Sequence, residues 1–229
     1  MSDKLLRILF PPKCVLCKKL LADWETDLCH SCRTDTPPFI KSNFPLSFIA
    51  RWTGVWYYKD TVRQSILRYK FYGRRSYADA YARVLAVKLQ TAGLDDFDVL
   101  TWVPVSRLRR LKRGYDQVEL LVHATGRELN VLPLRTLKKI RNTPPQSGFP
   151  DAARRRANVL NAYRVVHVHQ FAGKRVLLLD DILTTGATAS ECARVLLTAG
   201  AREVTFAAVA VTGQESRQSI NKRSSLTKR

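Results

Sequence analysis

The chain has 229 residues, 45% of them hydrophobic, which is enough for one α/β domain and a small additional segment. Lys and Arg number 39 against 19 Asp and Glu, a formal net charge of +20. This excess is far beyond what solubility requires and predicts polyanionic partners, although charge alone does not choose between small phosphates and nucleic acid. We find no secretory leader and no apolar run of membrane-spanning length, so we expect a cytoplasmic protein without membrane insertion.

The first cysteines form two Cys-x2-Cys pairs separated by eleven residues. This spacing is typical of a Zn²⁺ ion held by four thiolates, which leave no open coordination position, so we expect one structural zinc ion. Disulfides are disfavoured in a reducing compartment, and the presence of a second Cys-x2-Cys pair disfavours a redox site. His30 is the alternative zinc ligand. The expected zinc ligands are Cys14, Cys17, Cys29 and Cys32.

Proline and charge patterns divide the chain into four parts. Three prolines favour an extended linker after the cysteines, and the last residues are polar, basic and aperiodic. The expected parts are a zinc-binding segment at 1–36, a linker at 37–52, a main domain at 53–213 and a disordered tail at 214–229.

The main domain is expected to begin with an aromatic strand at 53–58 and two amphipathic helices over 62–69 and 78–89. Between the helices, the stretch 69–75 interleaves aromatic and basic residues. Such a stretch could stack bases and hold phosphates, but aromatic residues near a helix end more often belong to the core. We favour the core interpretation here.

A second buried strand is expected at 98–105, ending at Ser106. Five of the seven residues that follow, 107–113, are basic, and Gly114 comes next. An exposed charged loop is one interpretation. A basic loop at the end of a strand also suits a pyrophosphate, and we favour this second interpretation. A helix over 118–125 should follow.

Three prolines and a glycine within 141–150 exclude regular structure and predict a loop that could act as a lid. A short helix over 151–158 should follow, carrying three arginines that also fit a plain solvated face. Further strands are expected at 162–168 and 203–211.

The stretch from Val176 to Thr188 joins a buried strand, two adjacent acids and a turn of small residues. Four consecutive apolar residues predict a strand covered on both faces, as in a parallel sheet under helices. Asp180 and Asp181 follow at its carboxyl end, where α/β sheets bind ligands. Adjacent acids can accept hydrogen bonds from a vicinal diol, and the backbone around Gly186 can surround a phosphate. The alternative is a plain helix cap, after which Cys192 belongs to a buried helix face.

The same thirteen residues resemble the phosphoribosyl pyrophosphate (PRPP) signature of type I phosphoribosyltransferases at every position. The resemblance implies an open, mostly parallel α/β sheet with flanking helices, and PRPP bound with Mg²⁺. It implies that Asp180 and Asp181 are the catalytic pair that holds the ribose hydroxyls. The 5′-phosphate would be bound by Ile182, Leu183, Thr184, Thr185, Gly186, Ala187 and Thr188. The other side of the PRPP site would comprise Val105, Ser106, Arg107 and Arg113.

Further motifs recur in order over nearly the whole chain: Cys14–Cys32, Lys70–Arg74, Val103–Pro104, Arg113–Gln117, Thr143–Gln146, Arg155–Asn158 and Val176–Thr188. This order resembles the ComF/GntX family of bacterial competence proteins. The resemblance implies a link to the uptake of single-stranded DNA in natural transformation, with single-stranded DNA and a helicase-like uptake protein as partners. The family usually has Asn at the position of Asp116, so we expect a slightly more acidic pyrophosphate side here.

Three functions compete on this basis. The chain could be a phosphoribosyltransferase, which would include nucleobase or nucleotide salvage without a DNA role. It could instead be a PRPP-sensing protein that handles DNA without turnover, or a basic scaffold of the uptake machinery. The pair of acids favours the first two functions and the net charge of +20 favours the last two. No residue reveals the acceptor.

Overall fold

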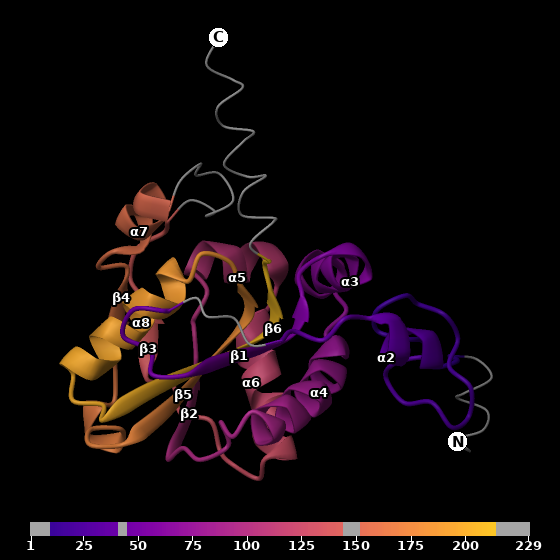
Figure 1. The fold of residues 1–229 in the computed structure, drawn as a ribbon. Helices are drawn as coiled ribbons and strands as arrows, with labels where there is room; N and C mark the ends of the chain where they lie inside the picture. The colour runs from indigo at the N-terminus through magenta and orange to yellow at the C-terminus, as the bar shows by residue number, and fades with distance from the viewer. Residues whose placement is uncertain (1–9, 41–44, 144–151, 214–229) are drawn as a thin grey trace.

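The main domain is a four-stranded parallel sheet with helices on both faces (Figure 1). The computed structural model describes residues 10–40, 45–143 and 152–213. The expected tail, most of the expected loop at 141–150 and part of the linker lie outside these residues. Across the sheet the strands are β1 (Trp52–Tyr57), β6 (Glu203–Val211), β5 (Arg175–Leu183) and β2 (Val99–Trp102).

Burial of both faces of β5 explains its unbroken apolar run. Leu177 and Leu179 belong to one hydrophobic core, and Val176 and Leu178 belong to a second core on the opposite face. Successive strand residues point to opposite faces, so only a sheet covered on both sides requires four apolar residues in a row. The expected parallel α/β architecture is confirmed. The first core is covered by α3 (Asp60–Phe71), α4 (Tyr77–Thr91) and α6 (Gln117–Glu128), and the second by α8 (Ala187–Thr198).

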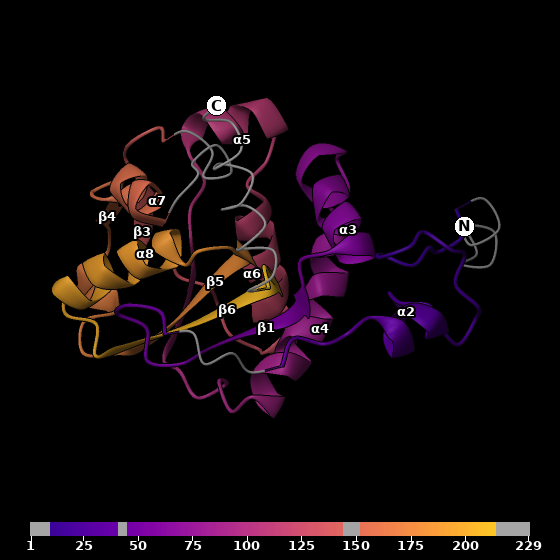
Figure 2. The ribbon, with the colours of Figure 1, turned by 45° about the horizontal axis from the view of Figure 1, so that its top comes forward.

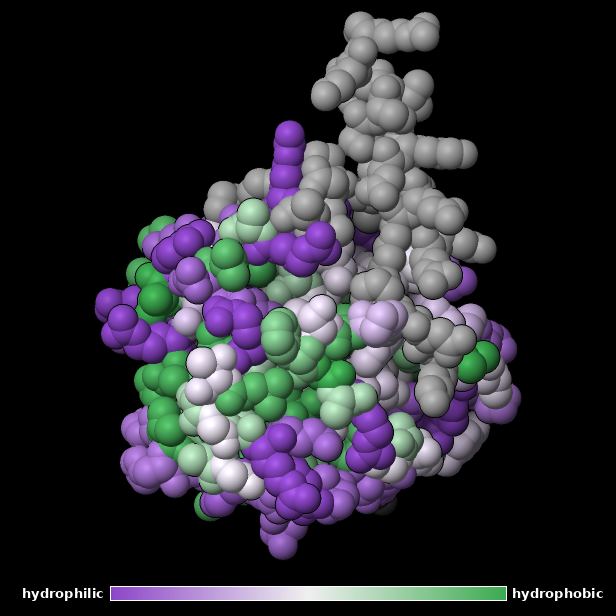
Figure 3. Space-filling view, turned by 60° about the vertical axis from the view of Figure 1, so that its left-hand side comes forward, coloured by the Kyte–Doolittle hydropathy of each residue, from purple (hydrophilic) through white to green (hydrophobic). Residues whose placement is uncertain are grey.

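A second, antiparallel pair of strands lies beside α8, outside the main sheet (Figure 1). The strand expected at 162–168 is shorter, because the chain turns at His167, whose φ is 55°, and passes into a 3-10 turn. Hydrophobic residues occupy the centre of this side of the molecule, with hydrophilic residues around them (Figure 3). The elements here are β3 (Leu137–Lys139), β4 (Tyr163–Val165), α7 (Ala152–Val159) and η2 (Val168–Gln170).

The basic stretch expected as a loop is a helix, α5 (Arg107–Arg113). Ser106 caps its start by accepting a hydrogen bond from the backbone N–H of Arg109 at 3.4 Å. Gly114 ends it with a φ of 76°, which glycine adopts without a steric penalty. The preceding strand is also shorter than expected and ends at Trp102.

The chain that enters the main domain packs against β1. Pro38 pairs with Trp56 in an antiparallel bridge. Phe39 is 4% exposed and stacks on Trp52, with ring centroids 5.4 Å apart. This part of the linker is therefore extended, as expected, and is fixed to the sheet by aromatic contacts.

The cysteine-containing segment packs on α3 and α4, on the side of the molecule away from α8 (Figures 1 and 2). Its Cys14, Val15 and Leu16 share the first core with Ile66 of α3. Ser65 of α3 donates a hydrogen bond to the carbonyl of Val15. The guanidinium of Arg83 contacts the carboxylate of Asp27 at 2.6 Å. The segment includes the short helix α2 (His30–Asp35).

No helix in the described parts of the chain combines the length and the apolar character that crossing a bilayer requires.

Gly126 of α6 gives a test of the packing between this helix and the segment after it. A Cβ atom at this position would lie 2.4 Å from the carbonyl oxygen of Val131 and 2.9 Å from the ring of Pro133. Gly126→Ala should therefore lower the free energy of unfolding by about 1–3 kcal/mol, as in overpacked cores. Helix propensity alone would raise that free energy by about 1 kcal/mol. A higher free energy of unfolding for the variant, measured by urea denaturation, would therefore contradict this packing.

Candidate functional site

The two acids lie at the carboxyl edge of the sheet, within the last residues of β5. The strand continues through them to Leu183, further than the apolar run predicts, and Asp180 pairs with Ala208 of β6. The strand on the other side, β2, ends opposite Leu179. The acids are therefore paired on one side and lie beyond the end of the neighbouring strand on the other, where α/β sheets bind ligands.

Asp181 is fixed from two sides. Its carboxylate contacts the ammonium of Lys70 at 2.8 Å and accepts a hydrogen bond from the amide Nε2 of Gln117 at 2.9 Å. Asp181 is 4% exposed and Gln117 is 3% exposed, so both partners compensate for the burial of a charge. The other amide atom of Gln117, Oε1, is buried without a hydrogen-bond partner among the described atoms.

Asp180 is the more accessible acid. It is partly exposed, and its Oδ1 accepts a hydrogen bond from the backbone N–H of Asp181 at 2.8 Å. Burial raises the pKa of Asp180 well above its usual value, and the charge of Asp181 adds to this effect, while Lys70 opposes it. The two adjacent acids therefore differ: one is held by a cation and an amide, and the other can accept a proton or a cation.

The predicted phosphate-binding residues fall into three structural parts. The side chain of Leu183 is 2% exposed and lies in the second core, so only its backbone could meet a ligand. Gly186 has a φ of 81° and caps α8, a helix of twelve residues whose first backbone N–H groups lie at this turn. The hydroxyl of Thr185 accepts a hydrogen bond from the N–H of Ala187 at 3.4 Å. The parts are the end of β5 (Ile182, Leu183), the turn (Thr184, Thr185, Gly186) and the start of α8 (Ala187, Thr188).

The chain beyond β2 forms the other side of the edge. Val103 donates its N–H to the carbonyl of Leu179 at 2.9 Å, which brings the following residues beside the acids. Ser106 is 4% exposed and caps α5, so its hydroxyl serves the fold. Val105 donates its N–H to the carboxylate of Asp116 at 3.2 Å.

Asp116 is a helix cap, although we expected it to make the pyrophosphate side more acidic. Asp116 is 7% exposed, and its carboxylate accepts hydrogen bonds from the N–H groups of Val118 and Glu119 at 2.9 and 3.1 Å. Burial raises its pKa. Because Asp and Asn cap helices about equally well, Asp116 can take the place of Asn without disturbing the start of α6.

The two arginines predicted for the pyrophosphate side lie at opposite ends of α5. Arg107 is exposed in its first turn, and Arg113 is half-buried in its last turn. The six steps of helical rise between them separate their Cα atoms by roughly 9 Å along the axis. Burial lowers the pKa of Arg113, and the charge of Asp181 opposes this shift. Arg113 is therefore the arginine of the pair whose charge acts on the acids.

Lys139 of β3 is a site candidate that sequence reasoning missed. Its ammonium lies 5.0 Å from the ring centre of Tyr163. Burial lowers the pKa of Lys139 to about 8, and the charge of Arg109 acts in the same direction, while Cys192 and Asp180 oppose them. The charge of this lysine therefore interacts with that of Asp180. Its neighbour Lys138 is exposed, and nothing in the local sequence distinguishes the two.

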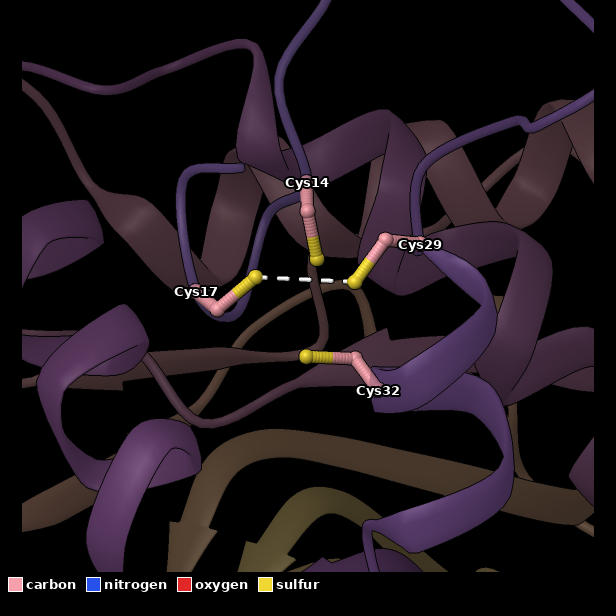
Figure 4. Close-up of side chains that lie close together, drawn as sticks. All are labelled: Cys14, Cys17, Cys29 and Cys32. Carbon is pink, nitrogen blue, oxygen red and sulfur yellow. Dashed lines mark hydrogen bonds between the residues drawn. The ribbon is translucent and has the colours of Figure 1, made fainter. Parts of the chain in front are cut away.

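The four cysteines of the amino-terminal segment form one cluster, and their sulfur atoms point toward a common centre (Figure 4). The sulfurs all lie within 4.8 Å of one another. A Zn²⁺ ion with tetrahedral bonds of about 2.3 Å would separate its sulfurs by roughly 3.8 Å. The Sγ atoms of Cys17 and Cys29 are 3.5 Å apart, and no disulfide joins any of the four, so the group fits a closed zinc site. The residues that would hold the ion are the expected Cys14, Cys17, Cys29 and Cys32.

Purified protein should contain about one zinc ion per chain by elemental analysis, according to the four-thiolate rule. Cys14→Ser should lose the zinc and lower the melting temperature, because the zinc segment shares its core with α3. Cys192→Ser is the matched control: Cys192 is equally buried but lies in the second core, so this variant should keep its zinc. Absence of zinc after reducing, chelator-free purification, or full zinc in the Cys14 variant, would contradict the assignment.

Two family models match the chain. A double zinc ribbon domain matches residues 5–44, and a phosphoribosyl transferase domain matches residues 136–228. The chain has only four cysteines in the first region, so it offers one four-thiolate site there. The second match includes the acids and the loop that follows them.

The relatives match over most of their length. Competence protein F of Haemophilus influenzae is 26% identical over 84% of this chain and 93% of its own. DNA utilization protein YhgH of Escherichia coli O157:H7 is 30% identical over 85% and 94%. Competence protein ComFC of Streptococcus pneumoniae is 30% identical over 81% and 77%.

Solved structures match less of the chain. The allosteric regulatory enzyme of purine biosynthesis is 21% identical, with a TM-score of 0.42, over 63% of this chain and 29% of that one. Glutamine PRPP amidotransferase of B. subtilis is 22% identical, with a TM-score of 0.42, over 61% and 30%. The chain thus spans less than a third of these larger proteins. Its matches to a zinc ribbon domain and a phosphoribosyltransferase domain, together with these relatives, show that the chain belongs to the competence protein F and YhgH family.

Proposed function

We propose that the chain binds PRPP together with Mg²⁺ at the carboxyl edge of the sheet. The observation that carries this proposal is the position of Asp180 and Asp181 near the end of β5, ahead of the turn at Gly186 that leads into α8. The acids suit the ribose hydroxyls, and the turn around Gly186 suits the 5′-phosphate because backbone N–H groups at a helix start attract anions. The match to a phosphoribosyl transferase domain supports the same assignment.

The pyrophosphate of PRPP needs positive charge on the opposite side. Arg113 and Lys139 are the cations whose pKa values respond to the acids, and they are the residues that we assign to this role. Asp180 suits Mg²⁺ as an accessible oxygen ligand, whereas both oxygens of Asp181 already have partners. Bound Mg²⁺ would neutralise negative charge on the pyrophosphate. Transfer of the phosphoribosyl group to an acceptor is the reaction that such a site supports. An assay of pyrophosphate release from PRPP, with nucleobases and single-stranded DNA each offered as the acceptor, would distinguish an enzyme that turns over from a protein that only senses PRPP.

Asp180→Asn should weaken PRPP binding about ten-fold or more in calorimetric titration with Mg²⁺ present, because the variant loses a charged acceptor for the ribose hydroxyls. The matched control is Asp95→Asn, which changes an exposed carboxylate before β2, at the other edge of the sheet. Equal PRPP affinity of the Asp180 variant and the wild type would contradict the proposed site.

We also propose that the chain binds single-stranded DNA through phosphate contacts. The net charge of +20 exceeds what PRPP requires, and relatives are named as competence and DNA utilization proteins. Helix α5 has five cations in seven residues and no acid, and its Arg107, Arg110 and Lys112 are exposed. The three arginines at 154–156 offer less exposed charge for such contacts than their number suggests, because Arg155 of α7 is 7% exposed.

Fluorescence anisotropy with an oligothymidine should show steep salt dependence, since each phosphate contact contributes roughly −0.7 to the slope of log K against log salt for single strands. Changing Arg110 and Lys112 together to Gln should reduce the magnitude of this slope by about 1.4. Changing the exposed Lys174 and Arg202 at the opposite edge of the sheet to Gln is the matched control and should leave it unchanged. Absence of binding at low salt would contradict the DNA proposal.

A further inference from the structure

The carboxyl-terminal end of α3 exposes two adjacent aromatic rings. Phe71 is 58% exposed and Tyr72 is 72% exposed, whereas Tyr69 is fully buried. The core interpretation of the stretch 69–75 is therefore correct for Tyr69 and wrong for Phe71 and Tyr72. Two neighbouring exposed rings have no role in packing the described core, so they are candidates for contact with a partner.

A cation contacts one of these rings, and a second cation lies in the same stretch of chain. The guanidinium of Arg113 lies 4.8 Å from the ring centre of Phe71, and that of Arg75 lies 4.9 Å from the ring centre of Tyr115. Arg75 also donates a hydrogen bond to the carbonyl of Gly114 at 3.4 Å. These contacts join the end of α3 to the end of α5, and the two helices lie beside each other at the same side of the molecule (Figure 2). The rings therefore adjoin the helix that carries five cations.

We propose that Phe71 and Tyr72 form a stacking platform for unpaired bases of single-stranded DNA, while the cations of α5 contact its phosphates. The inference rests on the proposed DNA binding and adds the base contacts to it. Aromatic rings next to a basic surface are what single strands require, because every base has a face that can stack and every nucleotide carries a phosphate. Bases in a duplex are already stacked on each other, so such a platform selects single strands.

The charges argue against a protein partner on the same surface. Phe71 and Tyr72 lie beside Arg74, Arg75 and the five cations of α5, and charges of one sign in this number attract a polyanion. A polyanion compensates these cations, whereas an apolar protein surface would leave them desolvated and unpaired.

The platform is directly connected to the predicted PRPP site. Lys70, between Tyr69 and Phe71 in the chain, contacts Asp181 at 2.8 Å. Arg113 contacts the Phe71 ring, and its pKa responds to the charge of Asp181. The same turn of α3 thus carries a ring that faces solvent and an ammonium that faces the acids.

The experiment compares two strands of about 20 nucleotides, enough to cover a single-strand binding site: oligothymidine and an abasic strand with the same phosphates. In fluorescence anisotropy the wild type should bind oligothymidine more tightly than the abasic strand, by about five-fold or more for each stacked base. Changing Phe71 and Tyr72 to Leu should abolish this preference and leave affinity for the abasic strand unchanged. Tyr72→Phe keeps a stacking ring and should keep the preference. Trp24→Leu is the matched control, since Trp24 is 84% exposed but lies in the zinc segment.

Each result has one meaning. If the wild type binds both strands equally, the platform is wrong and the proposed DNA binding stands. If it binds neither strand at low salt, both proposals fail. If the Leu variant keeps the preference for oligothymidine, bases contact another part of the chain and the platform is wrong. If sedimentation shows that the wild type self-associates through Phe71 and Tyr72 and has no base preference, this surface joins copies of the chain instead.

Discussion

The contact between Lys70 and Asp181, 2.8 Å long and buried, is the interaction on which the arrangement of the site depends. It joins α3 to the end of β5, and the hydrogen bond from Gln117 adds α6 to the same carboxylate. The hydroxyl of Tyr69 donates to the carbonyl of Gln117, and the hydroxyl of Tyr115 donates to the carbonyl of Tyr69. A buried charge is tolerated only when such partners surround it, so these helices have little freedom to move relative to the strand.

This constraint makes two chemically equal neighbours unequal. Asp181 is paired with a lysine, and its charge contributes to the raised pKa of Asp180. One acid then serves as a fixed acceptor, and the other can respond to a cation or a ligand hydroxyl. The pair is therefore suited to binding a diol next to a metal ion, and it would be an unfavourable arrangement if it served the fold alone.

Helix α3 connects three parts of the chain. Ser65 and Arg68 donate hydrogen bonds to carbonyl groups of the zinc segment, Lys70 contacts the acids, and the helix ends at the exposed Phe71. Loss of zinc would thus disturb a helix that also supports the site. The zinc segment has a structural role in the main domain for this reason, although none of its described residues, 10–36, lies at the carboxyl edge of the sheet.

Local patterns in the sequence determined the zinc ligands, the buried strand β5 and the acids at its end, because each depends on residues close together in the chain. The loop after the acids could also be predicted from the sequence, since Gly186 directly precedes the helix that it caps. The helix α5 was wrongly predicted to be a loop, because the prediction relied on its five cations and not on the helix caps Ser106 and Gly114 at its two ends. Only the tertiary structure decided which partners hold Asp181, because Gln117 lies 64 positions away in the chain and reaches it through the packing of α6. The different burial of Tyr69 and Phe71 was also decided by the tertiary structure. The two residues are only two positions apart in the chain, and the position of α3 against the sheet determines which ring is covered.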